Sequence, residues 1–198
     1  TINPYINFID DFILIIPTEI RQTNRGNFQV WEYMQTNARI WGVDFDMSYN
    51  LNKEFSLKNQ VSFLNGKDIS NSTPLINMPP TNIKNEVSYS SNKTNNLSFS
   101  IQSDYTFKQN RYPLHILEVF VAESGEMETL DLSTPPPGYH LLNFRSSILF
   151  KTRERYDIKV GLNISNLFNK TYKNYLSRMR YYSHDLGRNI ILNISLDY

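Results

Sequence analysis

The C-terminal residues carry the strictest pattern in this chain of 198 residues. Apolar residues occupy every second position of the final stretch, namely Ile190, Leu192, Ile194, Leu196 and Tyr198. The residues between them are polar, with Ile191 as the single exception. Because a period of two places neighbouring side chains on opposite faces of a β-strand, the pattern predicts a strand with one wholly apolar face.

Two architectures contain such a strand. In a soluble β-sandwich the apolar face packs against a second sheet, whereas in an outer-membrane barrel it faces lipid. The final strand ends on an aromatic residue, as the closing strand of a membrane barrel does, but a sandwich strand shows the same alternation. This strand alone therefore favours neither architecture, and the rest of the chain has to distinguish them.

The same alternation recurs along the chain. We expect strands over residues 5–16 (where the alternation is poor), 28–51, 55–63, 83–91, 97–107, 142–151, 156–165 and 189–198. Pro17 is expected to end the first strand, and the second strand is expected to bend near Asn37. The connections alternate between short polar turns and long loops over residues 18–27, 65–81, 110–137 and 166–187. About eight strands joined in this way, without a convincing helix, predict an all-β, antiparallel, up-and-down sheet.

Composition agrees with an all-β fold. Aromatic residues make up 14% of the chain, and Ala38 and Ala122 are its only alanines, which favours strand over helix. The absence of cysteine excludes disulfides and cysteine metal sites, and a net charge of +1 gives no indication of a nucleic-acid partner. A mean hydropathy of −0.46 is compatible with a membrane barrel, because such barrels are apolar only at alternate positions.

The apolar faces of the expected strands favour the membrane barrel. They carry large aromatic residues, many of them at strand ends, where a barrel meets the two membrane interfaces. These residues are Trp41, Phe45, Tyr49, Phe55, Phe63, Tyr89, Phe107, Phe144, Phe150, Tyr156 and Tyr198. Strands of roughly ten residues also match the length that crosses a bilayer at a tilt.

Five segments resemble the C-terminal part of TonB-dependent outer-membrane receptors. The clearest is Asn163–Tyr172, which is similar to the near-terminal N-L-F-N-K-x-Y motif of that family. The segment 38–46 resembles a strand in which the family usually has Glu where this chain has Asp44. The other three segments are residues 74–80, 134–143 and 186–189. The five segments follow the family's order and cover nearly the whole chain.

The resemblance implies a bacterial outer-membrane barrel of 22 strands, closed by an N-terminal plug domain. This chain would supply about the last eight strands, without the plug or the earlier strands. The chain begins at Thr1 without a signal segment, which we interpret as a piece of something longer or a processed product. The implied function is TonB-coupled uptake of a scarce nutrient of the ferric siderophore, haem or cobalamin class. The expected partners are membrane lipid, the plug and remaining strands, the TonB complex, and a small ligand such as an iron chelate.

Candidate ligand-binding residues lie in the expected external loops. Cationic and aromatic side chains suit an anionic, aromatic iron chelate, although interfacial anchoring is the simpler interpretation of the same residues. The candidates are Arg111, Tyr112, Arg178, Arg180, Tyr181 and Tyr182. His115, His140 and His184 lack the spacing of metal or haem ligands, so we interpret them as solvated.

The polar faces of the strands are expected to line the barrel lumen. Their charged residues would pair with one another or contact the plug, and they are Asp44, Asp104, Arg145, Asp157 and Lys159. Gly42 is expected on the same face, where a missing side chain leaves room for neighbours. By the resemblance, the alternating residues of the final strand, Ile190 to Tyr198, are a signal for barrel assembly.

Other functions remain open at the level of sequence. No nucleophile triad, paired catalytic carboxylates or phosphate-binding loop is present, so the sequence predicts neither an enzyme nor a resident cofactor or metal. One alternative is a self-contained barrel of eight strands with a structural or adhesive role. Another is a secreted, sugar-binding β-sandwich.

Overall fold

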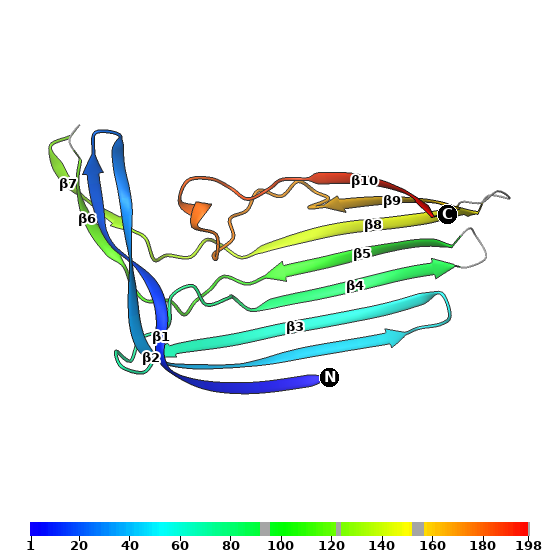
Figure 1. The fold of residues 1–198 in the computed structure, drawn as a ribbon, viewed down its shortest axis with the longest axis horizontal. Coiled ribbons are helices and arrows are strands. Elements are labelled where there is room, and N and C mark those ends of the chain that lie inside the picture. Colours follow the sequence, from blue (N-terminus) through cyan, green and yellow to red (C-terminus); the bar gives the residue numbers. More distant parts are fainter. Residues whose placement is uncertain (92–95, 122–123, 152–156, 198) are drawn as a thin grey trace.

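The structure is a computed structural model that describes residues 1–91, 96–121, 124–151 and 157–197. The turn expected at 92–96 lies outside the described residues except for Asn96, and the turn expected at 152–155 lies wholly outside them, as do Tyr156 and Tyr198. The main element is an antiparallel sheet of eight strands in the order β1-β2-β3-β4-β5-β8-β9-β10 (Figure 1). Its strands are β1 (Ile2–Thr23), β2 (Gly26–Asn50), β3 (Phe55–Asp68), β4 (Asn82–Ser91), β5 (Leu97–Thr106), β8 (Tyr139–Lys151), β9 (Asp157–Ser165) and β10 (Asn189–Asp197). The predicted all-β, up-and-down architecture is confirmed.

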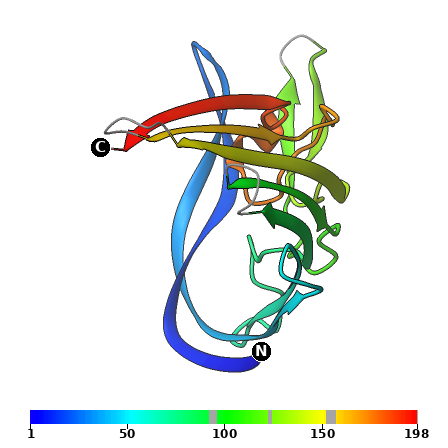
Figure 2. The same cartoon turned by 90° about the vertical axis from the view of Figure 1, so that its right-hand side faces the viewer.

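The sheet is curved and open. Seen nearly along its strands, it sweeps from β1 and β2 at the bottom of Figure 2 to β10 at the top. β1 and β10 form its two edges and do not pair with each other in the described part of the chain. Because eight strands do not close here, the structure favours a segment of a larger wall over a self-contained eight-stranded barrel.

The register separates a polar inner face from an apolar outer face. One inner row pairs Asp44 with Ser62 and Ser62 with Asn82, while the outer row beside it pairs Phe45 with Val61. Outer residues near both edges remain uncovered, with exposed fractions of 68% at Phe8 and 65% at Ile194. A soluble sandwich would bury such a face under a second sheet, so this single layer argues against the sandwich.

The first hairpin differs from the sequence prediction. Neither the stop at Pro17 nor the loop over residues 18–27 was correct, because β1 runs through Pro17 to Thr23 and pairs with β2 almost to the hairpin tip. Proline is tolerated because β1 is an edge strand and its register shifts immediately after Pro17. A second irregularity, after Ile9, lies opposite Asn37, where the bend was expected. Beyond it the hairpin turns away from the rest of the sheet (Figure 1).

Two predicted loops contain further structure. The expected loop over residues 110–137 folds into a second hairpin of β6 (Ile116–Val121) and β7 (Glu126–Asp131), turning at Gly125 with a φ of +71°. The segment 166–187 contains one short 3₁₀ helix, η1 (Arg178–Tyr181). No helix in the described ranges is long and apolar enough to cross a membrane.

Candidate functional site

The longer connections meet at one end of the sheet, which we call the long-loop end. It contains the tip of the β1–β2 hairpin, residues 69–81, the β6–β7 hairpin and residues 166–188. β1 contacts β6 there, so the two hairpins support each other. At the opposite end, which we call the short-turn end, the described residues contain one complete connection, the short stretch 51–54 that follows β2. The cavities described next lie at the long-loop end.

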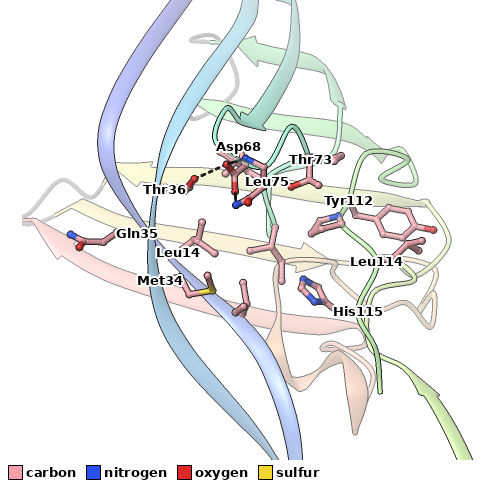
Figure 3. Close-up of a pocket in the computed structure, with 15 residues that line it drawn as sticks. Leu14, Met34, Gln35, Thr36, Asp68, Thr73, Leu75, Tyr112, Leu114 and His115 are labelled. Atoms are coloured by element: carbon pink, nitrogen blue, oxygen red, sulfur yellow. Dashed lines mark hydrogen bonds between the residues drawn. The ribbon is translucent and has the colours of Figure 1, made fainter. Parts of the chain in front are cut away.

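The first cavity, which we call the hairpin cavity, has a volume of about 540 Å³. It lies between the β1–β2 hairpin, the loop that follows β3, and the segment 112–115 (Figure 3). Its lining is largely apolar and includes Leu14, Ile16, Met34, Leu75, Tyr112, Leu114 and His115. Leu75 reaches this position because Gly66 has no side chain: a Cβ there would come within 2.9 Å of the Leu75 Cδ1 atom.

Polar groups hold one side of the hairpin cavity together. The Thr36 hydroxyl donates to Asp68 Oδ1 at 2.6 Å, and the Asn71 side-chain amide donates to Asp68 Oδ2 at 2.9 Å. On the opposite side, His115 Nε2 is buried and has no hydrogen-bond partner among the described residues. Desolvation lowers the pKa of His115 below its usual value, so the ring is neutral at pH 7. The cavity therefore suits an uncharged, largely apolar group with one hydrogen-bonding atom.

A second cavity of about 510 Å³ lies between the two hairpins and η1, and we call it the η1 cavity. Its walls come from β1, β2, β6, β7 and the last long connection, with Ile20, Gln29, Val119, Leu130, Lys173, Arg180, Tyr181 and Tyr182 among the lining residues. Four of these residues, Lys173, Arg180, Tyr181 and Tyr182, are cationic or aromatic, as expected for an aromatic, anionic ligand. Both cavities share the β1–β2 hairpin as a wall.

Arg180 and Tyr181 are engaged within the protein. The Arg180 guanidinium is buried, donates to the Tyr175 carbonyl oxygen, and donates to the Tyr181 hydroxyl at 2.7 Å. The guanidinium also stacks 4.3 Å from the centre of the Tyr175 ring. The Tyr181 hydroxyl donates in turn to the Leu132 carbonyl oxygen at 2.9 Å. These contacts attach η1 to the segment after β7, so Arg180 positions this connection.

Of the other four candidate ligand-binding residues, Arg178 and Tyr182 are exposed, and Arg111 and Tyr112 are half-buried. The Arg178 guanidinium lies 5.1 Å from the centre of the Trp31 ring, and both Arg178 and Tyr182 are exposed. The Arg111 guanidinium lies 4.5 Å from the centre of the Phe63 ring, while Tyr112 lines the hairpin cavity. Tyr112 thus lines the hairpin cavity, and Arg180, Tyr181 and Tyr182 line the η1 cavity, whereas Arg111 and Arg178 line neither. The role of all six residues in binding stays a prediction.

Asn166 organises the last long connection. It adopts a φ of +52°, and its side chain accepts from the Lys170 backbone N–H at 2.7 Å and donates to the Lys170 carbonyl oxygen at 2.8 Å. Asn169, with a φ of +53°, accepts from the Arg188 backbone N–H at 2.8 Å. Asparagine tolerates this left-handed conformation and can bond nearby backbone groups, which explains the N-L-F-N pattern at the point where the chain leaves β9.

The register places all five charged wall candidates on the inner face. Asp44 accepts from the Ser62 hydroxyl at 2.7 Å, and Asp104 accepts from the Asn82 side-chain amide at 2.6 Å. Arg145 donates to Gln102 Oε1 at 3.3 Å, and it lines with Lys159 a shallow depression of about 460 Å³. Asp157 lies on the same face, near the short-turn end of β9. Hydrogen bonds between neighbouring strands thus engage Asp44, Asp104 and Arg145.

The histidines lie apart from one another. His115 lines the hairpin cavity, His140 shares a hydrogen bond of 2.8 Å with the Ser103 hydroxyl on the outer face, and His184 lies exposed in the last connection. Within the described ranges, no group of three or more His, Cys, Asp or Glu side chains could hold a metal ion. Burial of His115 differs from the solvated environment that the sequence suggested, because the β1–β2 hairpin covers it.

A family model described as "TonB dependent receptor-like, beta-barrel" matches residues 1–167. The chain belongs to this family. Its members are bacterial outer-membrane barrels, so the apolar outer face meets lipid and the polar inner face lines the lumen. The long-loop end is the external end, since such barrels have short turns on the periplasmic side and longer loops outside. No curated protein sequence matches the chain.

Solved receptor barrels share the fold. The structure titled "Copper transporter OprC" aligns with a TM-score of 0.71 and 17% identity, covering 98% of this chain and 28% of that protein. The ferripyoverdine receptor of the outer membrane of Pseudomonas aeruginosa aligns with a TM-score of 0.54 and 14% identity, covering 96% of this chain and 24% of that protein. The chain thus spans about a quarter of the length of each of these receptors.

Sequence reasoning missed part of this external site. Leu14, Met34 and Gln29 line the two cavities, yet none was a candidate, because ligand-binding residues were sought only in the expected loops, whereas these three lie in the expected strands 5–16 and 28–51. The turn signal Asn24-Arg25-Gly26 between apolar stretches could have indicated a hairpin in place of a loop.

Proposed function

We propose that the chain forms the C-terminal part of the barrel of a receptor that takes up a scarce nutrient across the outer membrane. The nutrient belongs to the ferric siderophore, haem or cobalamin class, and transport is coupled to the TonB complex through a plug domain. Membership of the receptor family supports the transport role, and the two external cavities carry the proposal for binding. The chain spans about a quarter of the length of the solved receptors, which supports the proposal that the plug and the earlier strands belong to other parts of the receptor.

The external cavities suit a ligand with two chemically different parts. Tyr182 lines the η1 cavity, and Arg178 lies exposed on η1 itself, so the two offer an aromatic ring and a cation to an anionic or aromatic group. The hairpin cavity, with neutral His115, accepts an uncharged apolar group. Arg180 contributes by holding η1 in place, since its guanidinium already bonds Tyr175 and Tyr181.

The inner wall has a separate task in this proposal. Asp104, Arg145 and Lys159 present charge towards the lumen, where the plug domain of the receptor would lie. Because these residues carry charges of opposite sign on neighbouring strands, they would position a plug although the wall itself has no large net charge. A force transmitted by TonB to the plug would then break contacts with this wall and open a path for the nutrient.

Uptake and binding by the whole receptor test this proposal. A strain without the receptor is expected to lose growth on one iron chelate, haem or cobalamin source, and a strain without TonB is expected to show the same loss. The double variant Arg178→Ala and Tyr182→Ala should weaken binding of that nutrient by about tenfold, the loss of one charged and one aromatic contact. Arg25→Ala at the hairpin tip is the control and should leave affinity unchanged. Unaltered growth of the receptor deletion on all three nutrient classes would refute the proposal.

A further inference from the structure

Near the centre of the sheet, the outer face carries a group of neighbouring polar side chains. Asn59 on β3, Asn85 on β4, Ser103 on β5 and His140 on β8 make up this set, which we call the outer polar row. Asn59 pairs with Asn85 and Asn85 pairs with Ser103 in the register of the sheet. His140 lies diagonally across from Ser103, opposite Tyr105. All four alternate with the lumen-facing residues and therefore point towards lipid.

Aromatic residues place the outer polar row near the middle of the lipid-facing band. Along β3, Phe55 and Phe63 lie four residues before and after Asn59. Phe99 and Phe107 bracket Ser103 with the same spacing. Four residues correspond to roughly 13 Å along a strand, and aromatic girdles mark the two interfaces of a membrane barrel. Asn59, Asn85 and Ser103 are therefore distant from both interfaces, while His140 lies one register row closer to the external end.

Hydrocarbon cannot supply hydrogen bonds to these side chains. Two hydrogen bonds form within the row: the Asn59 amide donates to Asn85 Oδ1 at 2.5 Å, and Ser103 shares a hydrogen bond with His140. A carboxamide offers two N–H donors and an oxygen acceptor. In the described part of the chain, the Asn85 amide nitrogen and the Asn59 amide oxygen make no hydrogen bond, so donors and acceptors remain at the outer surface.

The row is confined to the centre of the sheet. On the edge strands the outward positions are apolar, with Ile2, Pro4, Ile6 and Phe8 on β1 and Ile190, Leu192, Ile194 and Leu196 on β10. Within the central strands, the row is flanked by exposed aliphatic residues such as Val87 and Ile101. A largely apolar surface with polar groups at its centre differs from a wall that meets only lipid.

We propose that the outer polar row is the surface on which a second copy of the receptor associates within the membrane. Two copies in one membrane are related by an axis along the membrane normal, so each row meets its own counterpart at equal depth. Amides present donors and acceptors together, and the row contains no Asp, Glu, Lys or Arg, so it is complementary to itself. Hydrogen bonds between polar side chains and close packing are the forces that associate proteins in lipid. The proposal rests on the membrane location of the family and is independent of the nutrient.

Cysteine crosslinking in outer membranes tests the proposal, because the chain contains no cysteine of its own. Val87→Cys places a thiol beside the polar row, at a position that is 47% exposed. Ile190→Cys is the matched control, since Ile190 is 60% exposed and lies in the same register row, on β10. With a short bifunctional maleimide, the full receptor carrying Val87→Cys should give a dimer, and the receptor carrying Ile190→Cys should remain monomeric.

Removing the polar groups provides the second arm. In the Val87→Cys background, Asn59→Leu, Asn85→Leu and Ser103→Val together should lower the crosslinked fraction at least fivefold. A heat-modifiable gel band verifies folding of this variant, and if it does not fold, the comparison of Val87→Cys with Ile190→Cys decides alone. A monomeric Val87→Cys receptor, a dimer that persists without the polar groups, or a crosslink to a different protein would each overturn the proposal.

Discussion

Replacement of Gly42 by alanine should destabilise the barrel wall. Gly42 lies on the inner face of β2, opposite Tyr5 on β1 and Leu64 on β3. A Cβ atom at Gly42 would meet the Tyr5 hydroxyl and would lie 2.5 Å from the Phe63 carbonyl oxygen. The Tyr5 ring can rotate away, but the carbonyl belongs to a strand that is hydrogen-bonded on both sides. Alanine therefore forces a shift of the backbone.

The structure supplies a matched control. Gly161 also lies on the inner face in the middle of a strand, but a Cβ there would be 3.7 Å from the Ser146 carbonyl oxygen, an ordinary contact. Overpacking of a filled site costs about 1–3 kcal/mol, which should outweigh the ~0.5–1 kcal/mol that alanine gains over glycine in a strand. Gly161→Ala should have only that gain. The two variants should therefore differ by about 2 kcal/mol in the free energy of unfolding.

Denaturant unfolding of the purified receptor in detergent measures this difference. The midpoint should fall for Gly42→Ala and stay equal or rise for Gly161→Ala, as followed by tryptophan fluorescence and by the heat-modifiable gel band. Adding Tyr5→Ala to Gly42→Ala should restore only part of the loss, because the Phe63 carbonyl contact remains. Equal midpoints for the two glycine variants would show that close backbone approach at Gly42 does not govern packing here.

Three further changes test the external end. Asn166→Ala removes both hydrogen bonds to Lys170 and leaves alanine at a φ of +52°. The free energy of protection from hydrogen exchange over residues 166–187 should therefore fall by about 2 kcal/mol, whereas the protection of β3 should not change. Leu75 is 1% exposed, so Leu75→Ala leaves a cavity and should lower the free energy of unfolding by about 2–5 kcal/mol. Leu186 is 80% exposed, so Leu186→Ala should leave that free energy almost unchanged in the same denaturant experiment. Burial lowers the pKa of His115 from 6.5, so the unfolded segment binds a proton first as pH falls. Protection of residues 112–115 from exchange should therefore decrease below pH 6.5, and His115→Gln should abolish this dependence; a pH-independent wild type would contradict it.

Much of the wall could be predicted from the sequence, because side-chain direction in a strand is a local property. The alternation around Asn59 and Ser103 assigned each residue to a face, and the register confirms the faces from β2 to β10. The failures occurred where tertiary contacts override local signals. Pro17 remains in a strand because β2 pairs with it at an edge, and β6 and β7 form a hairpin without strong alternation.

Residues that are neighbours in an external loop can have different environments in the folded protein. Arg178 and Arg180 are two positions apart and chemically identical, so the sequence treats them alike. In the structure Arg180 is buried between Tyr175 and Tyr181, while Arg178 remains exposed over Trp31. Their roles in ligand binding stay predictions, but their environments already differ.

The sequence by itself determined the two faces of the wall, the antiparallel order of its strands and the family, since all three follow from local alternation and short motifs. Only the tertiary structure decided which residues meet at the external cavities. Leu14, Leu75 and His115 are far apart in the chain, and they converge only after the first hairpin extends and the loop after β3 packs against Gly66. Such convergence depends on strand register and hairpin curvature, which are set by contacts between distant segments and not by the residues alone.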